Sequence, residues 1–209
     1  AVMTGAERDE TLNAVRTFPA VARMREWALR WADRRSPVGE RLVAWAFVEG
    51  VQFQGPFCAL QWLRERRLLP GITEYNTFIA RDEGVHTLFT CLLVSAYLLA
   101  RPGQARVEEI FSSGMANVDA LVAESLPARL IGMNAELMLD YVRYQADCVL
   151  AEMGYAPMYR VANPFPFMDK LTLNEVAKAN FFENRPSQYQ NVTRAGAARL
   201  TLDDSAVDY

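Results

Sequence analysis

A single carboxylate, that of Glu49, interrupts an apolar segment that spans residues 43–53. A helix that is apolar almost all round is typical of the interior of a protein. A carboxylate placed there is costly unless it is paired or binds a metal. The alternative is a glutamate on a narrow polar stripe that reaches water or an arginine. The fold therefore has to bring Glu49 to a cation or to solvent.

Apolar residues at helical spacing dominate the rest of the chain, which shows no internal repeat and no long strand-like alternation. The pattern predicts an all-α helical bundle. Pro19 should bend or divide the first helix, Gly154 should cap the fifth, and prolines should break the chain at residues 163–166. The predicted helices cover residues 9–34, 37–67, 73–99, 107–124 and 128–153, with a shorter helical stretch near residues 174–182.

Charge and composition exclude several classes of partner. The net charge of −3 gives no reason to expect a nucleic acid, and no apolar run is long enough to cross a bilayer. The three cysteines are scattered and form no C-x-x-C motif, which favours a reducing compartment. We therefore predict a cytoplasmic protein with neither a nucleic-acid nor a membrane partner.

Glu83 and His86 form a Glu-x-x-His motif within the third predicted helix. Residues three apart project from the same helix face, so both side chains could bind one metal centre. The motif is weak by itself, because a solvated glutamate beside a core histidine would look the same.

The combination of Glu49 with Glu83 and His86 is more specific than either signal. The two helices are joined by a short loop at Pro70, so they should pack antiparallel. Di-iron carboxylate proteins take a glutamate from each of two helices and a Glu-x-x-His motif from each of two others. This chain has one copy of each, and His86 is its only histidine. Carboxylates with one imidazole suit iron or manganese better than zinc.

The surrounding residues resemble the small, radical-generating subunit of class I ribonucleotide reductases, in its eukaryotic or viral form. The signature Arg-Asp-Glu-Gly-Val-His at residues 81–86 is the most specific element, and the resemblance covers nearly the whole chain. It implies a ferritin-like bundle over residues 1–184 and a flexible tail over residues 185–209. The segments that carry the resemblance are residues 39–44, 48–50, 62–72, 79–86, 130–134, 163–165 and 180–183.

The resemblance also implies roles for residues around the metal. Glu49, Glu83 and His86 would be ligands of iron in a di-iron centre, with manganese as the alternative metal. Asp82 would orient a histidine and couple the site to the electron path. The expected function is to hold a di-iron centre and a tyrosyl radical used to make deoxyribonucleotides.

A second group of implied roles concerns the radical and the partner subunits. Phe53, Phe57 and Ile79 would line the apolar pocket that shelters the radical, and Tyr189 would relay it between subunits. The terminal residues 202–209 would dock on the large subunit of the reductase. A homodimer, or a heterodimer with another small subunit, is expected as well.

Several positions depart from the family pattern. Gln52 and Gln54 stand where phenylalanine and serine are usual, and Pro56 lies inside the ligand helix, where it removes a hydrogen bond. The chain ends in Asp-Tyr where Asp-Phe is commoner. The family's first carboxylate ligand, first Glu-x-x-His and radical tyrosine have no counterpart in residues 1–35, so we expect the N-terminal ligand helices to be missing.

Three interpretations therefore stay open. The chain is part of an active subunit whose other ligands lie upstream, or it is a non-catalytic, degenerate partner of a true small subunit. In the third interpretation two chains, each giving Glu49 and Glu83-x-x-His86, assemble a different di-iron enzyme such as an oxygenase; the specific tail argues against that enzyme. A bundle without two ligand helices would leave the apolar faces of the Glu49 and His86 helices uncovered.

Overall fold

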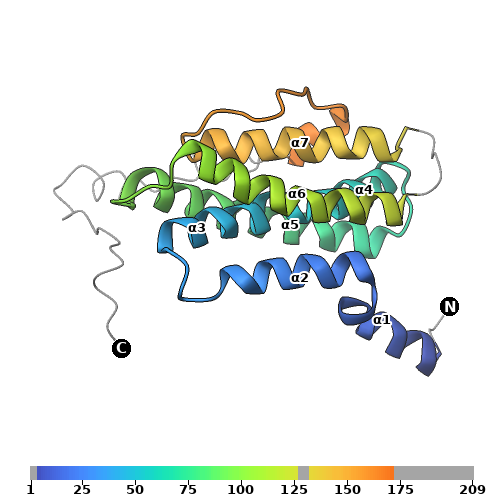
Figure 1. Cartoon of the computed structure of the whole chain (residues 1–209). Helices are drawn as coiled ribbons and strands as arrows, with labels where there is room; N and C mark the ends of the chain where they lie inside the picture. Colours follow the sequence, from blue (N-terminus) through green and yellow to red (C-terminus); the bar gives the residue numbers. More distant parts are fainter. Residues whose placement is uncertain (1–3, 127–131, 172–209) are drawn as a thin grey trace, which may run out of the picture.

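The computed structural model describes residues 4–126 and 132–171, and the regular elements in these ranges are helical, as the apolar spacing predicts (Figure 1). The bundle is therefore all-α in the part that is described. Its elements are α1 (Gly5–Thr17), α2 (Pro19–Trp31), α3 (Val38–Phe47), η1 (Val48–Gln52), α4 (Gln54–Glu65), α5 (Pro70–Leu92), η2 (Leu93–Tyr97), α6 (Gln104–Ser125), α7 (Ala135–Glu152) and η3 (Pro166–Leu171).

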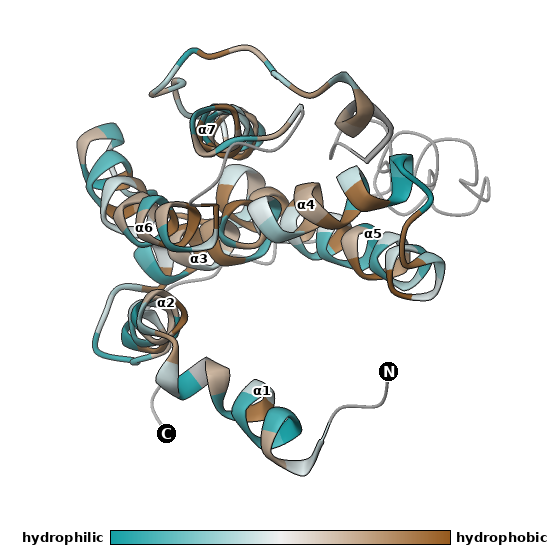
Figure 2. Cartoon of the chain, turned by 90° about the vertical axis from the view of Figure 1, so that its right-hand side faces the viewer, coloured by the Kyte–Doolittle hydropathy of each residue, from teal (hydrophilic) through white to brown (hydrophobic). Residues whose placement is uncertain are grey.

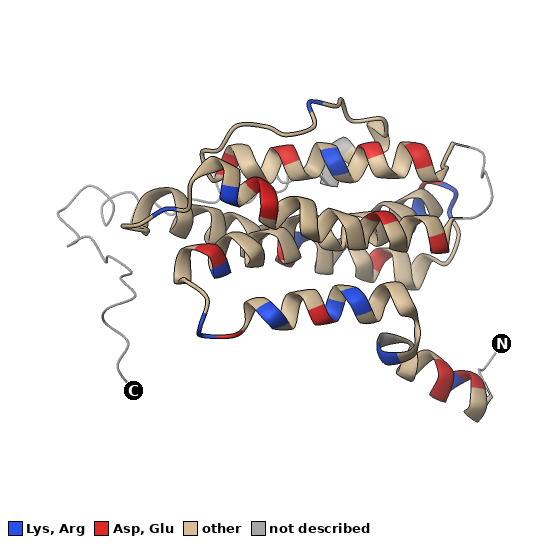
Figure 3. Ribbon diagram, viewed as in Figure 1, with Lys and Arg blue, Asp and Glu red and all other residues tan. Residues whose placement is uncertain are grey.

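The helices form three layers. Figure 2, which looks along the bundle, shows α7 on one side of a row made by α6, α3, α4 and α5, and α2 on the other side. Helix α3 packs against α2, α5, α6 and α7, while α5 lies at the edge of the row beside α4. Charged residues lie along both α2 and α7, mostly basic on α2 and mostly acidic on α7, as expected where helices face solvent (Figure 3).

An aromatic cluster occupies the centre of the core. The ring of Phe47 lies between those of Trp27 and Phe111, with centroid separations of 5.2 and 5.1 Å. All three side chains are buried, and they join α2, α3 and α6. Gly114 lets α6 approach this cluster, because a Cβ atom at that position would lie 2.5 Å from Cε1 of Phe47.

Most predicted helix boundaries are close to the observed ones, and the differences have local causes. The first helix is divided at Pro19, where Phe18 adopts an extended backbone. Gly154 has a φ of +80° and ends α7, as predicted. The second predicted helix is interrupted by the π-helical turn η1. The third begins at Pro70 and passes into a second π-helical turn, η2.

The fifth helix begins later than predicted. Residues 132–134 are not helical, and Asn134 caps α7 by accepting a hydrogen bond from the backbone N–H of Leu137. The predicted start at residue 128 was therefore wrong. The predicted short helix at residues 174–182 and the tail from residue 185 lie outside the described residues. Among the described helices, none has the length and apolarity needed to cross a bilayer.

We predict that Gly114→Ala destabilises the fold by about 1–3 kcal/mol, because the added methyl group would overlap the packed ring of Phe47. Gly71→Ala is a matched control, since a Cβ at Gly71 in the first turn of α5 has no neighbouring atom within 4 Å. That control should be neutral or slightly stabilising. Urea unfolding followed by circular dichroism measures both, and equal midpoints for the two variants would contradict the packing argument.

Candidate metal centre

Glu49, Glu83 and His86 converge at one place in the structure. Each offers one ligand atom, and these three atoms all lie within 4.8 Å of one another. Nδ1 of His86 is 3.4 Å from Oε2 of Glu83 and 3.6 Å from Oε2 of Glu49. Glu49 therefore points toward the Glu-x-x-His pair of the neighbouring helix, as its position in an apolar segment predicts.

The local backbone explains why Glu49 reaches α5. Glu49 lies in η1, and π-helical turns re-aim side chains because they contain an extra residue within the helix. The next residue, Gly50, is buried between α5 and α7. A Cβ atom there would lie 2.6 Å from the Cγ2 atoms of both Thr87 and Val149. The absence of a side chain at Gly50 thus allows η1 to approach α5 closely.

The α5 side of the cluster is held by two buried threonines. The hydroxyl of Thr87 donates to the carbonyl of Glu83 at 2.8 Å, and the hydroxyl of Thr90 donates to the carbonyl of His86 at 2.9 Å. The ligand side is more open. The side chain of His86 is 58% exposed, against 28% for Glu83 and 14% for Glu49. The cluster therefore lies at the boundary between the core and the surface.

The electrostatics of the cluster favour a bound cation. Burial, and then the hydrogen bond and negative charge of Glu83, raise the pKa of Glu49 to about 7, and His86 partly offsets this. Two carboxylates that disfavour each other's charge gain from a divalent cation between them. Two carboxylate oxygens and one imidazole nitrogen suit iron or manganese, so the residues present fit such a metal.

The other predicted residues flank this cluster. The side chain of Asp82 is 62% exposed, and its Oδ1 lies 3.7 Å from Nε of Arg81. Phe53 and Ile79 are exposed, and Phe57 is half-buried. In the described residues these three therefore do not form an enclosed pocket, and their role beside a radical stays a prediction. Tyr189 lies outside the described residues.

A buried polar chain was missed by the sequence reasoning. The hydroxyl of Tyr141 donates to Oε1 of Gln54 at 3.4 Å and accepts a hydrogen bond from Nε2 of Gln145 at 3.0 Å. Burial raises the pKa of Tyr141 well above its usual value. The unusual Gln54 is thus paired with a residue of α7. A glutamine at position 145, inside the apolar face of α7, was the available signal.

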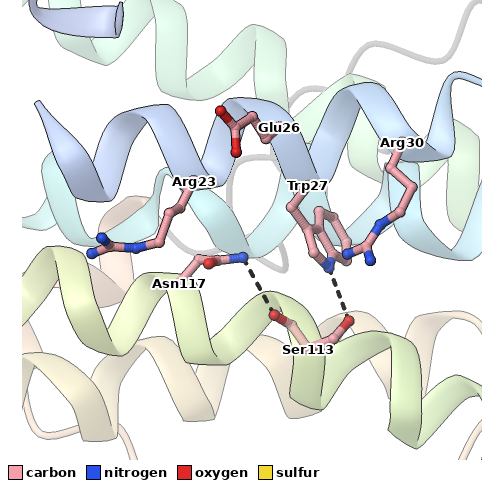
Figure 4. Close-up of a pocket in the computed structure, with 6 residues that line it drawn as sticks. All are labelled: Arg23, Glu26, Trp27, Arg30, Ser113 and Asn117. Carbon is pink, nitrogen blue, oxygen red and sulfur yellow. Dashed lines mark hydrogen bonds between the residues drawn. The ribbon is translucent and has the colours of Figure 1, made fainter. Parts of the chain in front are cut away.

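A hollow on the surface of the molecule lies apart from the Glu49, Glu83 and His86 cluster. It has a volume of about 400 Å³ and lies between α2 and α6 (Figure 4). Nε1 of Trp27 donates to the hydroxyl of Ser113 at its base, and Arg23 at its edge pairs with Glu124. The hollow is lined by Arg23, Glu26, Trp27, Arg30, Ser113 and Asn117, so it contains none of the three candidate ligands.

Comparison with known proteins identifies the family. Residues 1–164 match the family model described as "Ribonucleotide reductase, small chain". The chain belongs to this family. The M2 subunit of ribonucleoside-diphosphate reductase from Homo sapiens is 42% identical over 187 residues, which cover 89% of this chain and 47% of that protein. The small chain from African swine fever virus (isolate Warthog/Namibia/Wart80/1980) is 39% identical over 204 residues, covering 95% and 62%.

A solved structure supports the ferritin-like architecture of this family. The Rnr4 homodimer from Saccharomyces cerevisiae aligns with a TM-score of 0.67 and 30% sequence identity. The alignment covers 85% of this chain and 53% of the yeast chain. The chain spans about half the length of the mammalian and trypanosome relatives it matches. The ferritin-like class predicted from the sequence is confirmed, and the family resemblance is confirmed with it.

We predict that metal binding weakens as the pH falls below about 7. With its raised pKa, Glu49 holds a proton below that value, and a metal has to displace it. The apparent affinity for Mn²⁺, followed by electron paramagnetic resonance, should fall up to about tenfold per pH unit between pH 7 and 6, and vary less between pH 7 and 8. Glu49→Gln should lower the affinity, whereas Glu10→Gln on the exposed face of α1 should not. Equal affinities at pH 6 and 8 would contradict this account.

Proposed function

We propose that this chain forms part of the radical-generating small subunit of a ribonucleoside-diphosphate reductase, with Glu49, Glu83 and His86 as iron ligands. The convergence of these three side chains carries the proposal, because Glu49 lies in η1 and Glu83 and His86 lie in α5, and the fold brings their ligand atoms within 4.8 Å of one another. Membership in the small-chain family and the names of the relatives support it.

Iron is the metal we propose, with manganese as the alternative. Oxygen and nitrogen donors accommodate both ions, and the carboxylates offset their charge. When bound, such a centre supplies the one-electron oxidation of a tyrosine. The chain's own contribution is to fix the ligand geometry through Gly50 and the two buried threonines, and to keep Glu49 away from solvent.

The remaining roles follow from the family resemblance. Asp82 would orient a histidine of the complete site, and Phe53, Phe57 and Ile79 would shelter the radical once this face is covered. We further propose that residues 1–184 form the ferritin-like domain. Residues 185–209 would connect it to the large subunit, with Tyr189 as the radical relay. The scattered cysteines, all free in the structure, support a cytoplasmic location.

A non-catalytic partner is the second candidate function. These 209 residues contain one histidine, His86, and therefore one Glu-x-x-His motif, which such a partner protein would also have. Such a protein would keep the fold and the subunit contacts without holding metal. Metal content separates the two candidates, because a degenerate partner has no need to retain the ligand geometry.

We predict that the purified chain binds iron or manganese and that His86→Ala weakens this binding more than tenfold, because one of three ligands is lost. Mass spectrometry measures the amount of bound metal in both proteins, and electron paramagnetic resonance identifies the metal. Asn117→Ala, in the separate α2–α6 hollow, is the control and should bind normally. Wild-type chain that stays free of metal at saturating Fe²⁺, both alone and within the complete subunit, would exclude the metal-binding proposal and favour the non-catalytic partner.

The proposed tail predicts that docking on the large subunit and radical transfer depend on different residues. Deleting residues 202–209 should abolish co-elution with the large subunit, whereas Tyr189→Phe should leave co-elution unchanged and abolish nucleotide reduction in a complete, active assembly. Size-exclusion chromatography and a reductase assay measure the two effects. Normal reduction by the Tyr189→Phe assembly would contradict the proposed relay.

A further inference from the structure

The hydrogen bonds that join Gln145, Tyr141 and Gln54 connect the interior of α7 to the first residue of α4. We call these three residues the α7 anchor. At most 1% of the surface of Tyr141 and of Gln145 is exposed, so water does not compete for their bonds. Nε2 of Gln145 can only donate, and the hydroxyl of Tyr141 therefore uses its own hydrogen for Oε1 of Gln54. The anchor thus has a defined donor and acceptor at each step.

The backbone between η1 and α4 has few restraints of its own. Phe53 separates the two elements with φ of −102° and ψ of 3°, outside the α-helical region. Pro56, in the first turn of α4, has no N–H and cannot donate to the carbonyl of Gln52 four residues before it. The direction of η1 relative to α4 is therefore not fixed by a continuous ladder of backbone hydrogen bonds.

One face of α7 contacts η1 and the residue that follows it. Tyr141, Gln145 and Val149 are spaced by four residues, so they lie on the same face of α7, and all three are buried. Val149 packs against Gly50, the residue next to Glu49, and Tyr141 bonds to Gln54 just beyond the end of η1. This face of α7 therefore supplies the restraints that the backbone lacks.

We propose that Tyr141 and Gln54 are positioning residues of the metal site, because the α7 anchor holds η1 in its π-helical form and keeps the carboxylate of Glu49 directed at Glu83 and His86. This inference rests on the proposed metal role of those three residues. Tyr141 and Gln54 are not members of the ligand cluster, so they act through the backbone of η1.

The anchor is specific to the side chain at position 54. The bond from Tyr141 to Oε1 of Gln54 is 3.4 Å long, close to the limit for a hydrogen bond. The serine that is usual in the family at this position is shorter and could not make the bond without a movement of the backbone. Gln54 therefore gives this chain a restraint on η1 that a serine would not provide.

The affinity for Mn²⁺, followed by electron paramagnetic resonance, tests the proposal in the 209-residue chain, alone and within the complete subunit. Tyr141→Phe removes the hydroxyl but keeps the ring, which packs against that of Phe165. Gln54→Met removes the acceptor and keeps the length of the side chain. Each change should lower the affinity about tenfold, as when a hydrogen bond that orients a ligand is lost, and should alter the spectrum of bound Mn²⁺.

Tyr155→Phe is the matched control. The hydroxyl of Tyr155 donates to the carbonyl of Pro102 at 2.8 Å, so this variant also loses a tyrosine hydrogen bond, but one made to the loop before α6. The affinity for Mn²⁺ and the spectrum should both stay as in the wild type, although the bond that is lost is shorter than that of Tyr141.

A triple variant separates positioning from stability. Tyr141→Phe alone leaves the buried amide of Gln145 without its partner, so this variant should unfold at a lower urea concentration. Combining it with Gln54→Met and Gln145→Met removes every polar group of the anchor, and the midpoint should return toward that of the wild type. The affinity for Mn²⁺ should nevertheless stay low, because no bond then directs η1. Recovery of both would assign the anchor to stability alone and overturn the proposal.

The outcomes distinguish this inference from the proposed function. A wild-type protein that binds no Mn²⁺, alone or within the complete subunit, would overturn the proposed function and the inference together. A wild-type protein that binds Mn²⁺, with Tyr141→Phe indistinguishable from Tyr155→Phe in affinity and spectrum, would overturn only the positioning role. Weaker binding in Tyr141→Phe and Gln54→Met, but not in Tyr155→Phe, would support it.

Discussion

The close approach of η1 to α5 is the contact on which the candidate site depends. Gly50 makes it possible, because any side chain there would overlap Thr87 and Val149. The π-helical turn then directs the carboxylate of Glu49 toward Glu83 and His86. The same turn carries Gln52, and it ends before Gln54, whose side chain is bonded to Tyr141 of α7. A single irregular turn thus links the metal cluster to the buried polar chain behind it.

A typical surface helix buries apolar residues and exposes polar ones, whereas α5 buries mostly small polar residues and exposes large apolar ones. Its buried side is rich in threonine, and two of those threonines bond to the carbonyls of the ligand residues. Its outward side carries large apolar side chains that are at least half exposed, namely Tyr75, Phe78, Val85 and Phe89.

The fold class and the convergence of Glu49, Glu83 and His86 could both be predicted from the sequence. Glu49 was recognisable because it is an isolated charge in an apolar segment, and Glu83 and His86 because of their spacing. The π-helical turn was not predictable from periodicity, since a turn with one extra residue leaves no distinct pattern in five positions. The start of α7 was misplaced because the cap at Asn134 outweighs the helical propensity of the residues before it. The role of Gly50 required coordinates, because it depends on two residues distant in sequence.

The most direct test of the central claim is an anomalous difference map from crystals of the chain grown with Mn²⁺. We predict a peak about 2.0–2.2 Å from a carboxylate oxygen of Glu49, a carboxylate oxygen of Glu83 and a ring nitrogen of His86. A map with full Mn²⁺ occupancy elsewhere and no peak among these three side chains would contradict the account.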